Sequence, residues 1–163
     1  DPLFTHTTTG FTRPGDEEHP YLASVSCVHD PEEEGFVQEM IMQPEEAAKR
    51  VSAIPAGDGS FRTIPPEAFP EQVQIISRDA AGYALQLQIG GFPFNGEEVR
   101  LALGLPSACF ELNSHGSDVR FTVRGRGHGW GLSQTEAQAL AEDGWSAEAI
   151  LEYFYTGISF SSE

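Results

Sequence analysis

Basic residues are scarce in this chain of 163 residues: nine Lys and Arg stand against 25 Asp and Glu, giving a formal net charge of −16. A surface this acidic repels a phosphate backbone, so we expect no nucleic-acid partner. An anionic lipid surface is disfavoured for the same reason. The sequence also lacks an apolar run near the ~20 residues of a membrane-spanning helix, and it shows no targeting signal. Neutral or small polar ligands remain compatible with this composition.

Cysteine is scarce as well, with only Cys27 and Cys109, far apart in the sequence. A disulfide, a share in a metal site and two buried thiols all stay open; we favour two buried thiols, because cysteine is often fully buried. The other candidate metal ligands are five histidines: His6, His19, His29, His115 and His128. None of these residues stands at a recognised metal-binding spacing, so we expect no metal and no other cofactor.

The pattern of short apolar segments between glycines and prolines predicts one α+β domain over residues 1–163, built mainly from antiparallel β-hairpins. One hairpin joins residues 73–78 to 83–89, and a second joins 108–112 to 119–123 around a turn at 113–116. Alternation in the first hairpin places four side chains on one buried face: Tyr83, Leu85, Leu87 and Ile89. Residues 21–25 predict a further short strand, with which 35–43 could pair.

Four helices are expected between these strands and after them. Pro44 begins one, and a second covers residues 95–103 and ends at Gly104. Ser133-Gln134-Thr135-Glu136 is a capping box that begins a third helix, which Gly144 ends. The fourth carries an apolar stripe at helical spacing: Ala147, Ile150, Leu151 and Phe154. We expect the last two helices to pack against the sheet.

Glycine alternates through the segment Gly125-Arg126-Gly127-His128-Gly129-Trp130-Gly131. It lacks the Gly-Lys-Ser/Thr ending of a phosphate-binding loop. Glycines let backbone N–H groups approach a ligand, and Trp130 can cover the apolar face of a pyranose, while Arg126, His128 and Gln134 offer polar contacts. A sugar-binding floor fits this set; the alternative is a tight structural loop, with Trp130 in the core and His128 bonded to backbone.

Arginine is locally concentrated although the chain is acidic. Arg120, Arg124 and Arg126 fall within seven residues. They either mark a binding surface or pair with the many carboxylates, and the sequence leaves both interpretations open.

The segment from Gly125 to Gln134, Gly-Arg-Gly-His-Gly-Trp-Gly-Leu-Ser-Gln, resembles the stage II sporulation protein D family. The resemblance continues in Ile150-Leu151-Glu152-Tyr153-Phe154-Tyr155-Thr156-Gly157 after it. Earlier segments also match, in the family's order: residues 4–12, 19–25 and 99–110. Ordered matches over nearly the whole chain are much harder to obtain by chance than one glycine-rich run.

The resemblance implies a lytic transglycosylase, which cleaves peptidoglycan between N-acetylmuramic acid and N-acetylglucosamine and leaves a 1,6-anhydro end. One glutamate acts first as acid on the glycosidic oxygen and then as base toward the C6 hydroxyl. Glycan strands would be the substrate, and other cell-wall hydrolases or engulfment proteins would be partners. The location implied is extracytoplasmic, in the cell wall or the intermembrane space, with an anchor in an N-terminal segment outside this sequence.

The resemblance also assigns two distant segments to one substrate cleft. One wall would consist of His6, Thr7, Thr9, Gly10 and Thr12, whose hydroxyls and imidazole orient sugar groups. The other wall would consist of Arg126, His128, Gly129, Gly131, Ser133 and Gln134. We expect the loop amides of this second wall to face developing negative charge or N-acetyl carbonyls.

No residue of this chain matches the family's catalytic glutamate, which lies in an upstream helix, so we assign no catalytic residue. The chain therefore reads as a family domain without its upstream part, and whether it is an enzyme by itself stays open. Glu136 lies beside the glycine loop, but a capping box and a helix N-terminus favour its ionised form, which is a poor general acid. The alternative function is a non-catalytic peptidoglycan-binding or amidase-enhancer module.

Overall fold

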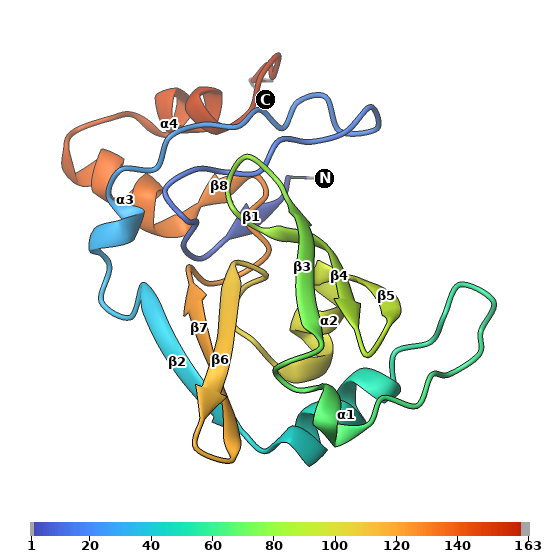
Figure 1. Cartoon of the computed structure of the whole chain (residues 1–163). Coiled ribbons are helices and arrows are strands. Elements are labelled where there is room, and N and C mark those ends of the chain that lie inside the picture. The colour runs from blue at the N-terminus through green and yellow to red at the C-terminus, as the bar shows by residue number, and fades with distance from the viewer. Residues whose placement is uncertain (1, 161–163) are drawn as a thin grey trace. The chain divides into compact units, whose positions relative to one another are not determined.

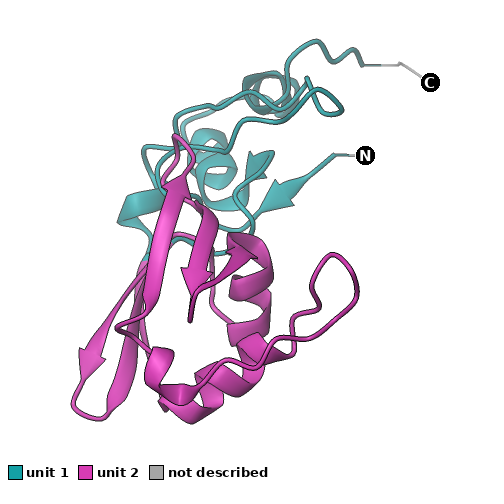
Figure 2. Cartoon of the chain, turned by 45° about the vertical axis from the view of Figure 1, so that its right-hand side comes forward, with its two compact units in different colours: residues 1–36, 125–163 teal, residues 37–124 magenta. Residues whose placement is uncertain are grey.

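The computed structural model describes residues 2–160 (Figure 1). The chain separates into two compact units: unit 1 contains residues 1–36 and 125–163, and unit 2 contains residues 37–124 (Figure 2). Antiparallel hairpins alternate with short helices, which confirms the α+β class. No helix in the described part of the chain has both the length and the apolar character that a membrane crossing requires. That residues 1–163 are one domain of a longer protein stays a prediction.

Unit 2 holds two three-stranded antiparallel sheets. The order of the first is β2 (Val37–Met42), β7 (Asp118–Arg124) and β6 (Phe110–His115). The order of the second is β3 (Val73–Arg78), β4 (Ala84–Ile89) and β5 (Phe92–Asn95). Both predicted hairpins are confirmed, although the turn of the second follows His115 rather than covering residues 113–116.

Two helices of unit 2 begin within one residue of the positions that the sequence indicated. Helix α1 (Pro44–Ser52) begins with its proline in the first turn. Helix α2 (Gly96–Leu103) is capped by the Asn95 side chain, which accepts from the Glu97 amide at 2.8 Å, and it ends at Gly104 in the left-handed region. The long segment between α1 and β3 contains one short 3₁₀ helix, η2 (Pro66–Ala68).

The core of unit 2 is apolar. Its largest fully buried members come from both sheets and both helices: Val51, Leu87, Ile89, Val99, Leu103, Phe110, Val119, Phe121 and Val123. The prediction that Leu85 shares the buried face of β4 was wrong, because Leu85 is 40% exposed. The pairing of β3 with β4 shifts register at Ser77, and such an irregularity changes which side of the sheet a residue faces.

Unit 1 combines a short parallel strand pair with two helices. Strand β1 (Phe4–Thr5) pairs with β8 (Leu132–Ser133), which leads directly into α3 (Gln134–Glu142). Helix α4 (Ala147–Phe154) follows. A small core joins these helices to the N-terminal segment: Leu22, Cys27, Leu140, Ile150, Phe154 and Tyr155. Ile150 and Phe154 of the predicted stripe are buried as expected, whereas Ala147 is exposed.

The predicted strand at residues 21–25 is absent, and β2 pairs with β7 rather than with this segment. Thr12 explains the loss, because its side chain replaces a regular ladder: the hydroxyl donates to the Ala23 carbonyl at 3.0 Å and accepts from the Val25 amide at 2.9 Å. Only isolated bridges remain nearby, such as Phe11 with Ser26. The favoured state of the cysteines is confirmed, since Cys27 and Cys109 are both buried free thiols.

Candidate functional site

The N-terminal segment and the glycine-rich loop are neighbours in unit 1. Thr7 and Arg126 exchange both of their main-chain hydrogen bonds, at 3.0 and 2.8 Å. The Thr5 hydroxyl donates to the Arg126 carbonyl and accepts from the Gly129 amide, both at 3.1 Å. The two segments that the sequence analysis placed in one site therefore lie together, although more than a hundred residues separate them.

The loop glycines make room for the protein's own N-terminal segment. A Cβ added at Gly131 would lie 1.8 Å from the Leu3 carbonyl oxygen, and one at Gly127 would lie 2.2 Å from the Thr5 hydroxyl. Both glycines also have positive φ, at +74° and +105°. Many of the loop amides expected to face a ligand already donate within the protein: those of Gly125, Arg126, Gly129, Trp130 and Leu132.

The residues predicted to bind substrate differ in their exposure. Arg126 and Gln134 are exposed, and His6, Thr9 and His128 are half-buried. The others are buried: Thr7, Gly10, Thr12, Gly129, Gly131 and Ser133. Within residues 2–160, neither the Arg126 guanidinium nor the Gln134 amide forms a hydrogen bond or an ion pair through its side chain. The accessible polar groups of the candidate site are thus a smaller set than the sequence suggested.

His6 and Thr7 lie at the beginning of α3. The His6 carbonyl accepts from the Thr135 amide at 3.1 Å, and the Ser133 hydroxyl oxygen lies 3.3 Å from the same carbonyl oxygen. The Thr7 hydroxyl is 2.6 Å from His6 Nδ1 and 3.0 Å from the Thr135 hydroxyl. Because the first turn of a helix leaves amide groups without intrahelical partners, these contacts fasten the N-terminal segment to α3.

Arg13 is a buried cation that the sequence analysis did not single out. Its guanidinium carbon lies 3.8 Å from the centre of the Trp130 ring, and its Nη1 donates to the His128 carbonyl at 3.2 Å. His128 Nδ1 accepts from the Trp130 amide at 3.1 Å, which places the proton of a neutral imidazole on Nε2. The indole nitrogen of Trp130 donates to the Pro14 carbonyl at 3.2 Å.

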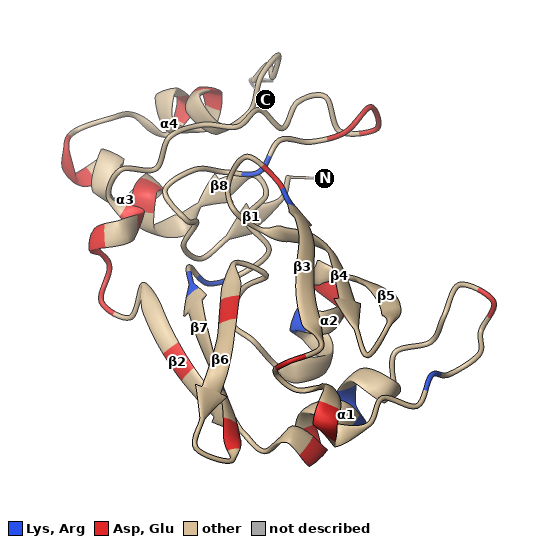
Figure 3. Cartoon of the chain, viewed as in Figure 1, with Lys and Arg blue, Asp and Glu red and all other residues tan. Residues whose placement is uncertain are grey.

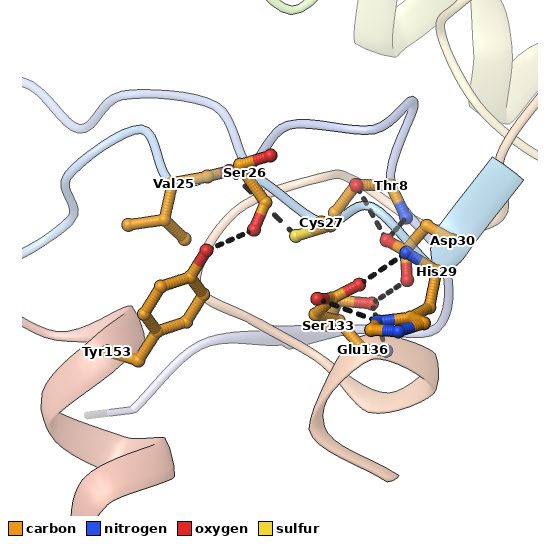
Figure 4. Close-up of polar contacts among 9 residues, drawn as sticks. All are labelled: Thr8, Val25, Ser26, Cys27, His29, Asp30, Ser133, Glu136 and Tyr153. Carbon is orange, nitrogen blue, oxygen red and sulfur yellow. Dashed lines mark hydrogen bonds and ion pairs between the residues drawn. The ribbon is translucent and has the colours of Figure 1, made fainter. Parts of the chain in front are cut away.

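Asp30 is fully buried and connects the N-terminal segment to α3 (Figure 4). Its Oδ2 accepts from the amide and the hydroxyl of Thr8, both at 2.6 Å. Its Oδ1 accepts from the Ser133 hydroxyl at 2.7 Å. Both carboxylate oxygens are therefore occupied by groups of the protein, and Asp30 holds together the two segments of the candidate site.

Glu136 is the second buried carboxylate in this cluster, at 2% exposure. Its amide donates to the Ser133 hydroxyl at 3.3 Å, as a capping box predicts. Its carboxylate turns to His29, accepting from the backbone amide at 2.8 Å and contacting Nδ1 at 3.1 Å. These partners hold Glu136 as an internal acceptor, and this supports the expectation that it is not the catalytic acid.

The electrostatics of this cluster follow from its burial. Burial raises the pKa of Asp30, and the neighbouring Glu136 raises it further, against the lowering effect of the bonds from Thr8 and Ser133. Burial also raises the pKa of the Cys27 thiol to about 12, so this cysteine stays protonated and unreactive. The hydrogen bond to Glu136 raises the pKa of His29.

Acidic residues are spread over both units (Figure 3). Two of the three clustered arginines pair with carboxylates of unit 2: Arg120 with Glu39 at 3.8 Å, and Arg124 with Glu111 at 3.5 Å. The ion-pair interpretation therefore applies to these two, and Arg126 differs from them. Among the described residues, no group of three His, Cys, Asp or Glu side chains lies together so that it could hold a metal ion.

Two curated relatives carry the same name. Stage II sporulation protein D of Bacillus amyloliquefaciens is 28% identical over 162 residues, which make up 97% of this chain and 44% of the relative. The protein of that name from Bacillus subtilis (strain 168) is 40% identical over 73 residues, 45% of this chain and 21% of the relative. The chain is similar over nearly its whole length to stage II sporulation protein D. It spans less than half the length of these relatives.

No protein-family model matches the chain, so the relationship rests on these two pairwise sequence similarities. It confirms the resemblance seen in the glycine-rich loop and in the N-terminal segment. It also makes this a chain of a sporulation-related family. In this chain, the loop and the N-terminal segment are joined by main-chain pairing, and two buried carboxylates lie next to that junction.

Proposed function

We propose that this chain supplies the glycan-binding surface of a peptidoglycan lytic transglycosylase that acts in sporulation. The catalytic glutamate would lie in a part of the longer protein that this chain does not include. One observation carries the proposal: Thr7 and Arg126 pair through both main-chain hydrogen bonds and bring the two family segments together. The name of the relatives supports the sporulation setting.

The chemistry of the accessible groups suits a sugar. Arg126 and Gln134 project exposed donors, and Gln134 also offers an acceptor, while His6 and His128 add imidazole groups at the same junction. Hydroxyl and N-acetyl groups are neutral, so a chain of charge −16 repels only the lactyl carboxylates of such a glycan. The buried Asp30 and Glu136 would act one layer below, because they fix Thr8, Ser133 and His29 rather than contact a ligand.

In this function the chain would bind and orient the glycan, and the glutamate supplied elsewhere would donate a proton to the leaving glycosidic oxygen and then accept the proton of the attacking C6 hydroxyl. Attack by the C6 hydroxyl of the same sugar ring needs no water and no second carboxylate, unlike ordinary glycoside hydrolysis. The setting proposed is extracytoplasmic, with glycan strands as substrate and other cell-wall hydrolases or engulfment proteins as partners.

Binding to purified glycan strands stripped of their peptides tests the proposal. A variant with Arg126→Ala and Gln134→Ala removes exposed side chains that form no hydrogen bond or ion pair within residues 2–160, so it should fold normally and bind at least tenfold more weakly. Arg120→Ala and Arg124→Ala in unit 2, made singly, are matched controls, because each removes one positive charge, as the site variant does, but from an arginine that pairs with a carboxylate. Equal affinities for the site variant and the controls would overturn the proposal.

The second candidate is a non-catalytic peptidoglycan-binding or amidase-enhancer module. The observation that favours it is that both buried carboxylates of unit 1 are occupied by internal donors. Incubating the longer protein with stripped glycan separates the two candidates. Anhydro-ended products that disappear when its upstream glutamate becomes glutamine support the transglycosylase, and binding without such products supports the module.

A further inference from the structure

Trp130 borders a hollow of about 360 Å³ in unit 1. The rest of its lining comes from the N-terminal part of the chain: Leu3, Pro14, Gly15, Asp16, His19 and Leu22. The volume lies at the lower end of ligand-binding pockets, which run from about 300 to 1,000 Å³. Most of the lining is apolar, and one carboxylate and one imidazole provide its charged or titratable groups.

The indole that borders this hollow is held in one orientation. The Arg13 guanidinium lies over its ring at 3.8 Å, and its nitrogen donates to the Pro14 carbonyl at 3.2 Å. The His128 ring is 5.7 Å away, centre to centre. A ring fixed by its neighbours offers apolar contact area without losing side-chain entropy when a ligand binds.

The polar groups of the hollow are fixed as well. Asp16 Oδ1 contacts His19 Nδ1 at 2.8 Å and accepts from the His19 amide at 3.0 Å. The hydrogen bond to His19 lowers the pKa of Asp16, so the carboxylate is ionised at neutral pH. Its Oδ2 accepts no hydrogen bond within residues 2–160, and the side chain is 70% exposed. An ionised oxygen of this kind is a ready acceptor for sugar hydroxyls.

From this arrangement we infer that the hollow between Trp130 and the Asp16–His19 pair is a subsite for one neutral N-acetylhexosamine ring of the glycan. The inference rests on the proposed function and adds which sugar of the glycan this part of the site binds. Apolar contact with the indole suits a pyranose, and Asp16 accepts from its hydroxyls. The same carboxylate repels the lactyl carboxylate of N-acetylmuramic acid, so the subsite takes N-acetylglucosamine.

Fluorescence provides a direct test, because the chain has only two tryptophans, Trp130 and Trp145. Trp145 is 44% exposed and packs on Tyr153, away from the lining of the hollow. In a Trp145→Phe background, titration with the neutral trimer triacetylchitotriose should change the emission of Trp130 and saturate. Asp16→Ala in that background should weaken binding three- to tenfold, and Asp16→Asn should reduce the preference over a muramic-acid-containing glycan.

Calorimetry on the remaining variants completes the test. Trp130→Ala should lose at least tenfold in affinity for the trimer, and Trp145→Ala should stay within twofold of the parent. Since Trp130→Ala could disturb the loop, the surface variant Asp16→Ala decides in that case. If glycan strands bind but neither the Trp130 emission nor the Asp16 variants respond, the subsite is wrong and the proposed function survives. If neither the strands nor the trimer bind, both are wrong.

Discussion

The interior of unit 1 and the interior of unit 2 are stabilised by different kinds of interaction. Nine polar or charged residues are buried in the described part of the chain, and all of them except Ser107 belong to unit 1. Unit 2 instead buries large apolar side chains from its two sheets and two helices. Burial of a polar group is favourable only with a matched partner, whereas apolar packing tolerates many alternatives. Unit 1 should therefore be the more sensitive unit to single polar substitutions.

Asp30→Ala should produce the largest effect on this contrast. The substitution leaves the buried amide and hydroxyl of Thr8 without their acceptor, and the Ser133 hydroxyl loses the shorter of its two acceptor contacts. We expect a loss of about 4 kcal/mol in the free energy of unfolding, since each buried unsatisfied group costs about 1–3 kcal/mol. Urea unfolding measures the loss. Hydrogen exchange should accelerate more at the Gly129 amide of unit 1 than at the amides of β7 in unit 2.

Asp58→Ala in unit 2 is the matched control for this substitution. Asp58 also accepts from an amide and a hydroxyl, both of Ser60, but it is exposed to solvent. Water replaces its contacts, so the stability should hardly change. Similar losses for the two variants, or a loss of protection in β7 as large as that in the loop, would contradict the difference between the units.

The same contrast decides what the sequence could predict. The hairpins and helices of unit 2 follow from periodicity and local capping, which short windows of sequence contain. The contacts of Asp30 and Arg13 reach partners 103 and 115 residues away, and no local pattern signals them. Family resemblance located the two site segments, yet it did not reveal that the glycines receive the N-terminal segment. That fact depends on main-chain packing and not on residue spacing.

A pair of glycine substitutions in unit 1 sharpens the point with a smaller effect. Gly131 and Gly144 both have positive φ, at +74° and +89°, so alanine at either position costs about 1–2 kcal/mol in backbone conformation. At Gly131 the new Cβ also meets the Leu3 carbonyl oxygen at 1.8 Å, whereas at Gly144 it meets open space. Gly131→Ala should therefore lose about 2 kcal/mol more than Gly144→Ala in thermal unfolding.

Equal melting temperatures for the two glycine variants would show that the N-terminal segment is not seated against the loop. A second measurement separates this from a general loss of stability. The Leu132 amide donates to the Leu3 carbonyl at 3.0 Å, so its hydrogen exchange should accelerate in Gly131→Ala and stay unchanged in Gly144→Ala.

The smallest expected effect is a pH dependence of the contact between His29 and Glu136. The hydrogen bond to Glu136 raises the pKa of His29 in the folded state, so the folded protein holds this proton more tightly than the unfolded chain. The resulting stabilisation is complete below the ordinary histidine pKa, about 6.5, and is lost as the pH rises through the raised value. His29→Gln should therefore destabilise the protein more at pH 5.5 than at pH 9. The control repeats His29→Gln in a Glu136→Gln background, where this pH dependence should vanish because the partner carboxylate is gone. The pH response of Asp30 is present both with and without the His29 substitution, so it cancels from the comparison. If His29→Gln costs the same stability at pH 5.5 as at pH 9 in the parent protein, the buried carboxylate does not hold a protonated His29.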